Sequence, residues 1–134
     1  MADSRDYQFI VTAGAKRDLV ACKEEDSFAA ATISTLLREI LTHGRDASQM
    51  VEDDFSDEEI HSVGPIWSLQ DMRINAYRVR MALIDRWRLI FAVDRLDQRI
   101  ALVAVMHRDD DYQNNRALWR DIEREYDELG FRRY

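Results

Sequence analysis

Three segments in the second half of the sequence constrain the fold most. Apolar residues occupy alternate positions from Tyr77 to Leu83 and from Trp87 to Val93, which is the period of a half-buried β-strand. Residues 100–106 are apolar throughout, and this pattern predicts a central strand covered on both faces. Because the links between the segments are short and polar, we expect an antiparallel meander.

The first half predicts one more strand and a pair of helices. Tyr7, Phe9 and Val11 alternate with other residues, and Thr12 is suited to cap a helix over about 13–23. A second helix begins near Ser27, carries one apolar stripe and ends before Gly44; the stripe consists of Ile33, Leu36, Leu37, Ile40 and Leu41. A last helix is expected over about 114–129. The order predicts one α+β domain over residues 1–134, in which a helical hairpin and the last helix pack on one face of an antiparallel sheet.

An acidic stretch separates the two halves. Residues 46–61 contain seven Asp and Glu and no Lys or Arg, which equals the net charge of −7 of the whole chain. We interpret residues 45–64 as a solvated or disordered insertion, in which Ser56 and Glu59 are suited to cap a short helix. Gly64 and Pro65 then mark a turn back into ordered structure.

The following part of the chain is locally basic. Residues 73–108 contain eight arginines and three acidic residues. Because the planar guanidinium binds phosphate oxygens in pairs, we expect Arg73, Arg78, Arg80 and Arg88 to contact RNA. The alternative is that these arginines form a solvated strand face paired with acids. The acidic stretch is also a candidate to fold over them as an internal phosphate mimic.

Other features restrict the class of protein. The sequence has no run of eighteen apolar residues and no apolar signal near Met1, so we expect a cytoplasmic protein with no membrane partner. Cys22 is the only cysteine, and the adjacent carboxylates of Asp109 to Asp111 diverge, so no disulfide, metal site or cofactor is expected. The three tryptophans, Trp67, Trp87 and Trp119, are interpreted as core or interface anchors.

Three motifs occur in the order typical of one family. They are Tyr77-Arg78-Val79-Arg80, the segment WRLIFAV at 87–93, and HRDDDY at 107–112. With the N-terminal strand and helical hairpin, they make residues 7–112 resemble the RelE/ParE superfamily of toxins from bacterial toxin–antitoxin systems. The resemblance implies a compact microbial-ribonuclease-like fold and a small cognate antitoxin as partner. By position, Arg80, Arg88, Arg108 and Tyr112 match arginines and a tyrosine of the family motifs.

The resemblance implies an endoribonuclease that cuts translated mRNA on the ribosome without a metal. Such cleavage needs a base for the ribose 2′-hydroxyl, a proton donor for the leaving oxygen and cations for the phosphate, and leaves a 2′,3′-cyclic phosphate. Arg88, His107, Arg108 and Tyr112 are the candidate catalytic residues, with His107 as acid or base because histidine titrates near neutral pH. No lysine follows Lys23, so lysine-dependent catalysis has no equivalent.

Two other functions stay open on the sequence. One is inhibition of DNA gyrase without catalysis, which the ParE-like members of the family perform. The other is a catalytically silent protein-binding module with this fold and an acidic surface.

Overall fold

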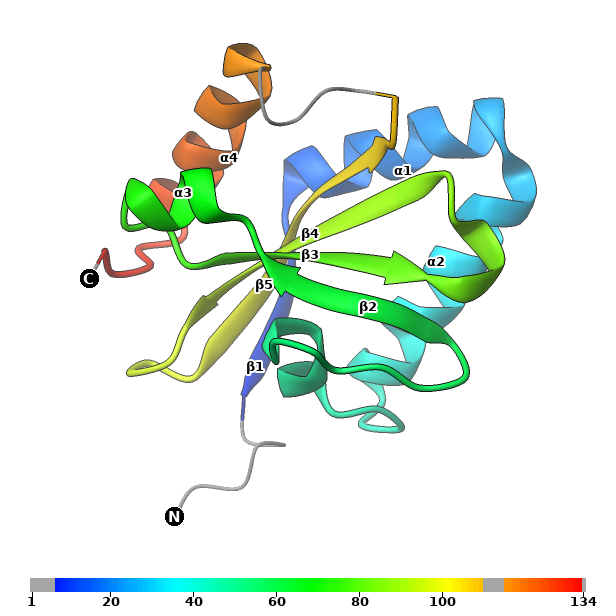
Figure 1. The fold of residues 1–134 in the computed structure, drawn as a ribbon, viewed down its shortest axis with the longest axis horizontal. Coiled ribbons are helices and arrows are strands. Elements are labelled where there is room, and N and C mark those ends of the chain that lie inside the picture. Colours follow the sequence, from blue (N-terminus) through cyan, green and yellow to red (C-terminus); the bar gives the residue numbers. More distant parts are fainter. Residues whose placement is uncertain (1–6, 110–114, 134) are drawn as a thin grey trace.

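The chain forms an α+β fold around one five-stranded mixed sheet, seen here in a computed structural model that describes residues 7–109 and 115–133 (Figure 1). The strands lie in the order β1-β5-β4-β3-β2, and their bounds are β1 Gln8–Val11, β2 Ile60–Pro65, β3 Ala76–Met81, β4 Trp87–Asp94 and β5 Arg99–His107. β1 pairs with β5 in parallel, and the other neighbours are antiparallel. The predicted α+β class and the meander of β3, β4 and β5 are confirmed.

The three long helices begin where the sequence offers capping side chains, whereas the short helix at Trp67–Asp71 has no side-chain cap. The helices are α1 (Ala13–Glu25), α2 (Ser27–Leu41), α3 (Trp67–Asp71) and α4 (Arg116–Glu128), with short 3₁₀ helices at Ala47–Val51 and Ala82–Ile84. The Thr12 hydroxyl accepts a hydrogen bond of 3.1 Å from the Ala15 amide, and Asp26 accepts one of 3.0 Å from the Ala29 amide. These contacts satisfy amides that have no partner within the helix. The predicted hairpin of the first two helices is confirmed.

Helices pack on both faces of the sheet, so the expected one-sided arrangement is wrong. α1 and α2 bury one face through a core that includes Ile33 and Leu36 of α2 and Leu89 and Phe91 of β4. Ile122 and Tyr126 of α4 contribute to a second core on the opposite face, with Ala101 and Val103 of β5 and Leu69 of α3. Figure 1 shows the hairpin and α4 on opposite sides of the strands. The apolar pattern of β5 fits burial on both sides, as predicted.

The acidic stretch is part of the fold and not a solvated insertion. Met50, Val51 and Ile60 are fully buried in the first core, and residues 60–65 form the edge strand β2 beside β3. Ser56 does not begin a helix, because the carboxylate of Asp57 instead accepts the amides of Glu59 and Ile60 at 2.9 and 2.7 Å. Gly64 and Pro65 lie within β2.

Two boundaries also differ from expectation. The strand predicted to reach Leu83 ends at Met81, and Leu83 lies exposed in the 3₁₀ turn before β4. The last helix begins at Arg116, and the part of its expected span before residue 115 lies outside the described residues.

Candidate functional site

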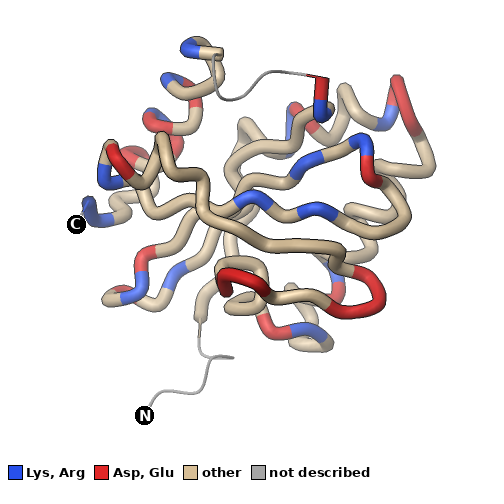
Figure 2. Tube along the Cα trace, in the orientation of Figure 1, with Lys and Arg blue, Asp and Glu red and all other residues tan. Residues whose placement is uncertain are grey.

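Three of the predicted arginines meet at the turn between β3 and β4. Arg80 Nη2 lies 2.6 Å from Asp85 Oδ1, Arg88 Nη1 donates to the backbone carbonyl of Asp85, and Arg108 Nη1 lies 3.6 Å from Asp85 Oδ2. We call Arg80, Arg88 and Arg108 the arginine cluster. The Arg108 amide is held at this end of the sheet by a hydrogen bond of 2.7 Å to the Arg86 carbonyl. Figure 2 shows basic segments on the neighbouring strands β3 and β4.

The strand register explains the arginine cluster. Val79 pairs with Leu89, so the residue after one and the residue before the other, Arg80 and Arg88, are neighbours on the same face. Trp87 pairs with His107, so Arg108 follows at the same end. Hydrogen bonding to Arg80, together with the charges of the arginine cluster, lowers the pKa of Asp85. A second carboxylate, Asp109, lies 4.0 Å from Arg108 Nε, so three guanidinium groups stand against two carboxylates. The remaining excess of positive charge suits a phosphate.

His107 lies at the same end of the sheet but on its other face. Its ring packs edge-on against Trp87 with centroids 5.3 Å apart, whereas Arg88 pairs with Met106 of the second core. The Asp109 amide lies 3.1 Å from His107 Nδ1, and the Asp109 carboxylate lies 3.3 Å from the same atom. This carboxylate is also 4.0 Å from Arg108 Nε, so His107 adjoins the arginine cluster through Asp109, although its ring packs on the other face of the sheet. Tyr112, the fourth predicted catalytic residue, lies outside the described residues.

The other two predicted RNA-binding arginines lie apart from the arginine cluster. Arg73 precedes β3 with a positive φ of 63°, at the opposite end of this strand from Arg80. Arg78 is opposite Gly64 of the edge strand, and a Cβ on Gly64 would lie 3.6 Å from Arg78 Nη2. The guanidinium of Arg78 lines a hollow with Gly64, Pro65 and Trp67, together with the acidic pair Asp53 and Asp54. Trp67 is 70% exposed, so of the two expected roles, core anchor or interface anchor, only the second remains open for this tryptophan.

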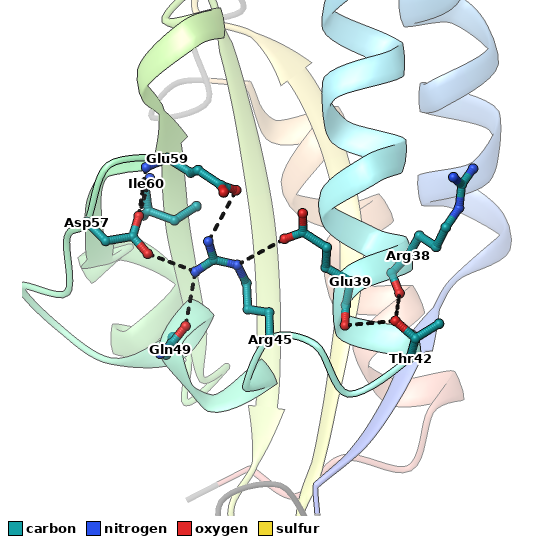
Figure 3. Close-up of polar contacts among 8 residues, drawn as sticks. All are labelled: Arg38, Glu39, Thr42, Arg45, Gln49, Asp57, Glu59 and Ile60. Carbon is teal, nitrogen blue, oxygen red and sulfur yellow. Dashed lines mark hydrogen bonds and ion pairs between the residues drawn. The ribbon is translucent and has the colours of Figure 1, made fainter.

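Sequence reasoning missed a second charged centre, built on Arg45. Its guanidinium, with a side chain only 9% exposed, lies 3.0 Å from Asp57, 3.2 Å from Glu59 and 3.6 Å from Glu39 (Figure 3). It also donates to Gln49 at 3.0 Å. Figure 3 shows these side chains converging on Arg45 from α2, the 3₁₀ helix and the segment before β2. The sequence feature that could have predicted this centre is the position of Arg45, which directly precedes the acidic stretch.

The Arg45 centre changes the interpretation of the acidic stretch. Burial lowers the pKa of Arg45, but hydrogen bonds and charges from Asp57 and Glu59 outweigh this effect and raise it overall. Asp57 and Glu59 are thus directed to Arg45 and not to the arginines of β3 and β4. The carboxylates that pair with the arginine cluster belong to Asp85 and Asp109, and both lie outside the acidic stretch.

A further cleft lies between α1 and α4. The Gly14 amide donates to Glu125 at 2.9 Å, and the carboxylate of Asp18 accepts the Val105 amide at 2.9 Å. Burial raises the pKa of Asp18, with Asp121 and Glu125 adding repulsion. The first contact joins α4 to the start of α1, and the second joins α1 to β5.

Among the residues that the structure describes, no group of three or more His, Cys, Asp or Glu is placed to hold a metal ion. Cys22 is buried, and its burial raises the pKa of the thiol to about 11. No helix in the described ranges has the length and apolar content to cross a membrane. Comparison with known proteins gave no matching family model, no matching curated protein and no matching solved structure.

Proposed function

We propose that this chain is a toxin-like protein of the RelE/ParE type that cleaves translated mRNA on the ribosome and is held inactive by a cognate antitoxin. The observation that carries the proposal is the arginine cluster, which gathers Arg80, Arg88 and Arg108 around Asp85. All three are positions at which the sequence resembles the family motifs.

The arrangement of elements supports the resemblance. β1 and the α1–α2 hairpin precede the β3–β4–β5 meander, as expected for the family. The motif YRVR lies in β3, the motif WRLIFAV lies in β4, and His107 and Arg108 stand at the end of β5. The three motifs are thus brought to adjacent strands, although they are separated in the sequence.

The chemistry assigns the arginine cluster to the phosphate. The ribose 2′-oxygen attacks phosphorus, the bond to the 5′-oxygen breaks, and the 2′-proton passes to a base while the leaving oxygen receives a proton. Charge builds on the phosphate oxygens during this step, and fixed guanidinium groups stabilise it. Arg88 and Arg108 provide two such groups. When the phosphate binds, the contacts of these arginines with Asp85 are replaced by contacts with the phosphate oxygens. His107, on the other face, is the candidate acid or base, but the proposal does not depend on it.

The test is to map new mRNA 5′ ends in a cell-free translation reaction. We expect cuts within translated codons with the wild type, and their loss in the double variant Arg88→Ala/Arg108→Ala. The matched control is Arg38→Ala/Arg124→Ala, which removes two exposed arginines from α2 and α4 and should cut like the wild type. His107→Ala separates acid–base catalysis by His107 from phosphate binding by the arginine cluster. If this variant still cuts mRNA, the arginine cluster alone accounts for the contribution of this region to cleavage.

Two other outcomes would replace the proposal. If the folded protein produces no cuts but blocks supercoiling by purified DNA gyrase, the ParE-like activity is correct. If it does neither and tolerates the loss of Arg88 and Arg108, the chain is a silent binding module.

A further inference from the structure

Trp67 is the most exposed aromatic side chain among the described residues, whereas the apolar residues near it in the sequence are buried. It is 70% exposed, while Ile66 and Leu69 are 4% and 0% exposed. α3 thus anchors itself in the second core through those two residues and leaves the indole on the surface. A large exposed aromatic side chain beside a hollow is characteristic of binding surfaces.

Arg78 reaches the same hollow from the sheet. Gly64, its partner on β2, has no side chain, so the guanidinium extends over the edge strand toward the segment that carries Trp67. The hollow therefore combines an aromatic ring with a cation. Asp53 and Asp54 at its rim supply hydrogen-bond acceptors, and the Asp54 amide is fixed to the Val63 carbonyl at 3.0 Å.

The hollow continues the arginine cluster along the sheet. Arg78 and Arg80 are two residues apart on β3 and so point to the same face, about 7 Å apart along the strand. One nucleotide of an extended single strand spans a similar distance. Arg80 is in turn the neighbour of Arg88, so a line of guanidinium groups runs from the hollow to the arginine cluster.

We propose that the hollow binds one nucleotide of single-stranded RNA, with its base stacked on Trp67 and its phosphate contacted by Arg78. This inference rests on the proposed function, because it takes the RNA substrate as the occupant and adds a second contact point on its path. The positive charge of the arginine line matches the RNA backbone, and the aromatic ring matches a base. The carboxylates of Asp53 and Asp54 favour a base that carries an amino group.

The test measures binding of a short fluorescent single-stranded RNA by anisotropy, without ribosomes. Trp67→Ala should weaken binding by about 5- to 150-fold, which is the range for losing one stacked base. Trp67→Phe should restore most of the affinity. Leu96→Ala, which removes a 79% exposed apolar side chain from the β4–β5 turn, is the matched control and should bind like the wild type.

An RNA with one abasic site supplies the second arm. A series of RNAs carries this site at successive positions. At one position the abasic site should weaken binding by the wild type, and at the same position it should leave the affinity of Trp67→Ala unchanged. Gly64→Val should also weaken binding, because its side chain occupies the space that Arg78 crosses.

The outcomes separate this inference from the proposed function. Wild-type affinity in a folded Trp67→Ala variant would overturn the inference even if mRNA is cleaved. Tryptophan-dependent binding without any cleavage would support the inference and remove the nuclease. Absence of RNA binding by the wild type would overturn the inference, while the proposed function would still stand or fall on the cuts within translated codons on the ribosome.

Discussion

Replacing Arg45 by methionine tests whether one buried cation holds the acidic stretch in the fold. The change removes the ion pairs to Asp57, Glu59 and Glu39 and the hydrogen bond to Gln49, while keeping a flexible apolar chain of similar length. The three carboxylates are 36–54% exposed, so each can be hydrated after the loss. The cost is therefore that of several partly exposed contacts and not that of an isolated buried charge.

The magnitude follows from these contacts. Partly exposed ion pairs contribute about 0.2–1 kcal/mol each, and the hydrogen bond to Gln49 adds about 1 kcal/mol. Because methionine needs no desolvation, part of the loss is recovered, and we expect the free energy of unfolding to fall by about 2 kcal/mol. In urea this corresponds to a midpoint lower by about 1 M, followed by tryptophan fluorescence.

Arg38→Met is the matched control. It makes the same substitution in an exposed arginine of α2 whose guanidinium points away from the Arg45 centre in Figure 3. The control should change stability by less than about 0.5 kcal/mol. An Arg45→Met variant that unfolds at the same midpoint as Arg38→Met would refute the reasoning.

Acid provides an independent check on the same centre. Burial raises the pKa of Asp57, but hydrogen bonds from the Ile60 amide and Arg45 lower it overall. A lowered pKa stabilises the fold above the unfolded value of about 3.9, and this contribution disappears as the pH falls through the folded pKa. The difference in free energy of unfolding between wild type and Arg45→Met should thus have its full value at pH 7 and become smaller below about pH 4.

Three further predictions use the other charged groups. Asp85→Asn frees the arginine cluster from a carboxylate whose pKa Arg80 keeps low, so single-stranded RNA should bind more tightly and with a steeper salt dependence; an unchanged slope would contradict phosphate binding there. Burial raises the pKa of Asp18, so its ionised form reduces stability above that pKa, while Asn keeps an acceptor for the Val105 amide. Asp18→Asn should therefore stabilise the protein at pH 7 and by less near pH 4 in urea titrations, and destabilisation at pH 7 would be inconsistent with this sign. With the pKa of Cys22 raised to about 11, iodoacetamide at pH 8 should label the native protein only as fast as it unfolds, and labelling at the rate of a small free thiol would disprove this.

The sequence predicted strands from two patterns, alternation in β3 and β4 and a continuous apolar run in β5. The alternate positions of β3 and β4, such as Val79, Leu89 and Phe91, face the first core, and Thr12 was recognisable as a cap. β2 was missed because its register shifts between Ile60 and Ser62, so its buried residues Ile60 and Val63 are three apart and resemble neither a strand nor a helix. The acidic residues before it strengthened the wrong interpretation as an insertion.

The candidate site was predictable in its residues and not in its geometry. The motifs selected Arg80, Arg88 and Arg108, but their meeting at Asp85 depends on the β3–β4 and β4–β5 registers, which a single sequence does not determine. His107 was included because of its chemistry and its place beside Arg108, and Asp109 links these two side chains. The ring of His107 nevertheless packs against Trp87, on the face of the sheet opposite to Arg88. The same alternation extended the first strand of the meander to Leu83, although the chain already turns there and exposes this leucine.

The parallel pairing of β1 with β5 has a consequence for how the protein is made. Phe9 pairs with Ile100, so β1, the first strand of the sheet to be synthesised, cannot pair until β5, the last one, has been synthesised. Until β5 has left the ribosome, α1 and α2 have no complete sheet to pack against, and their apolar sides are available to chaperones. The arginine cluster takes one member from β3, one from β4 and one from just beyond β5, so it assembles only at this late stage. A nascent chain therefore cannot complete the arginine cluster before β5 and Arg108 have emerged.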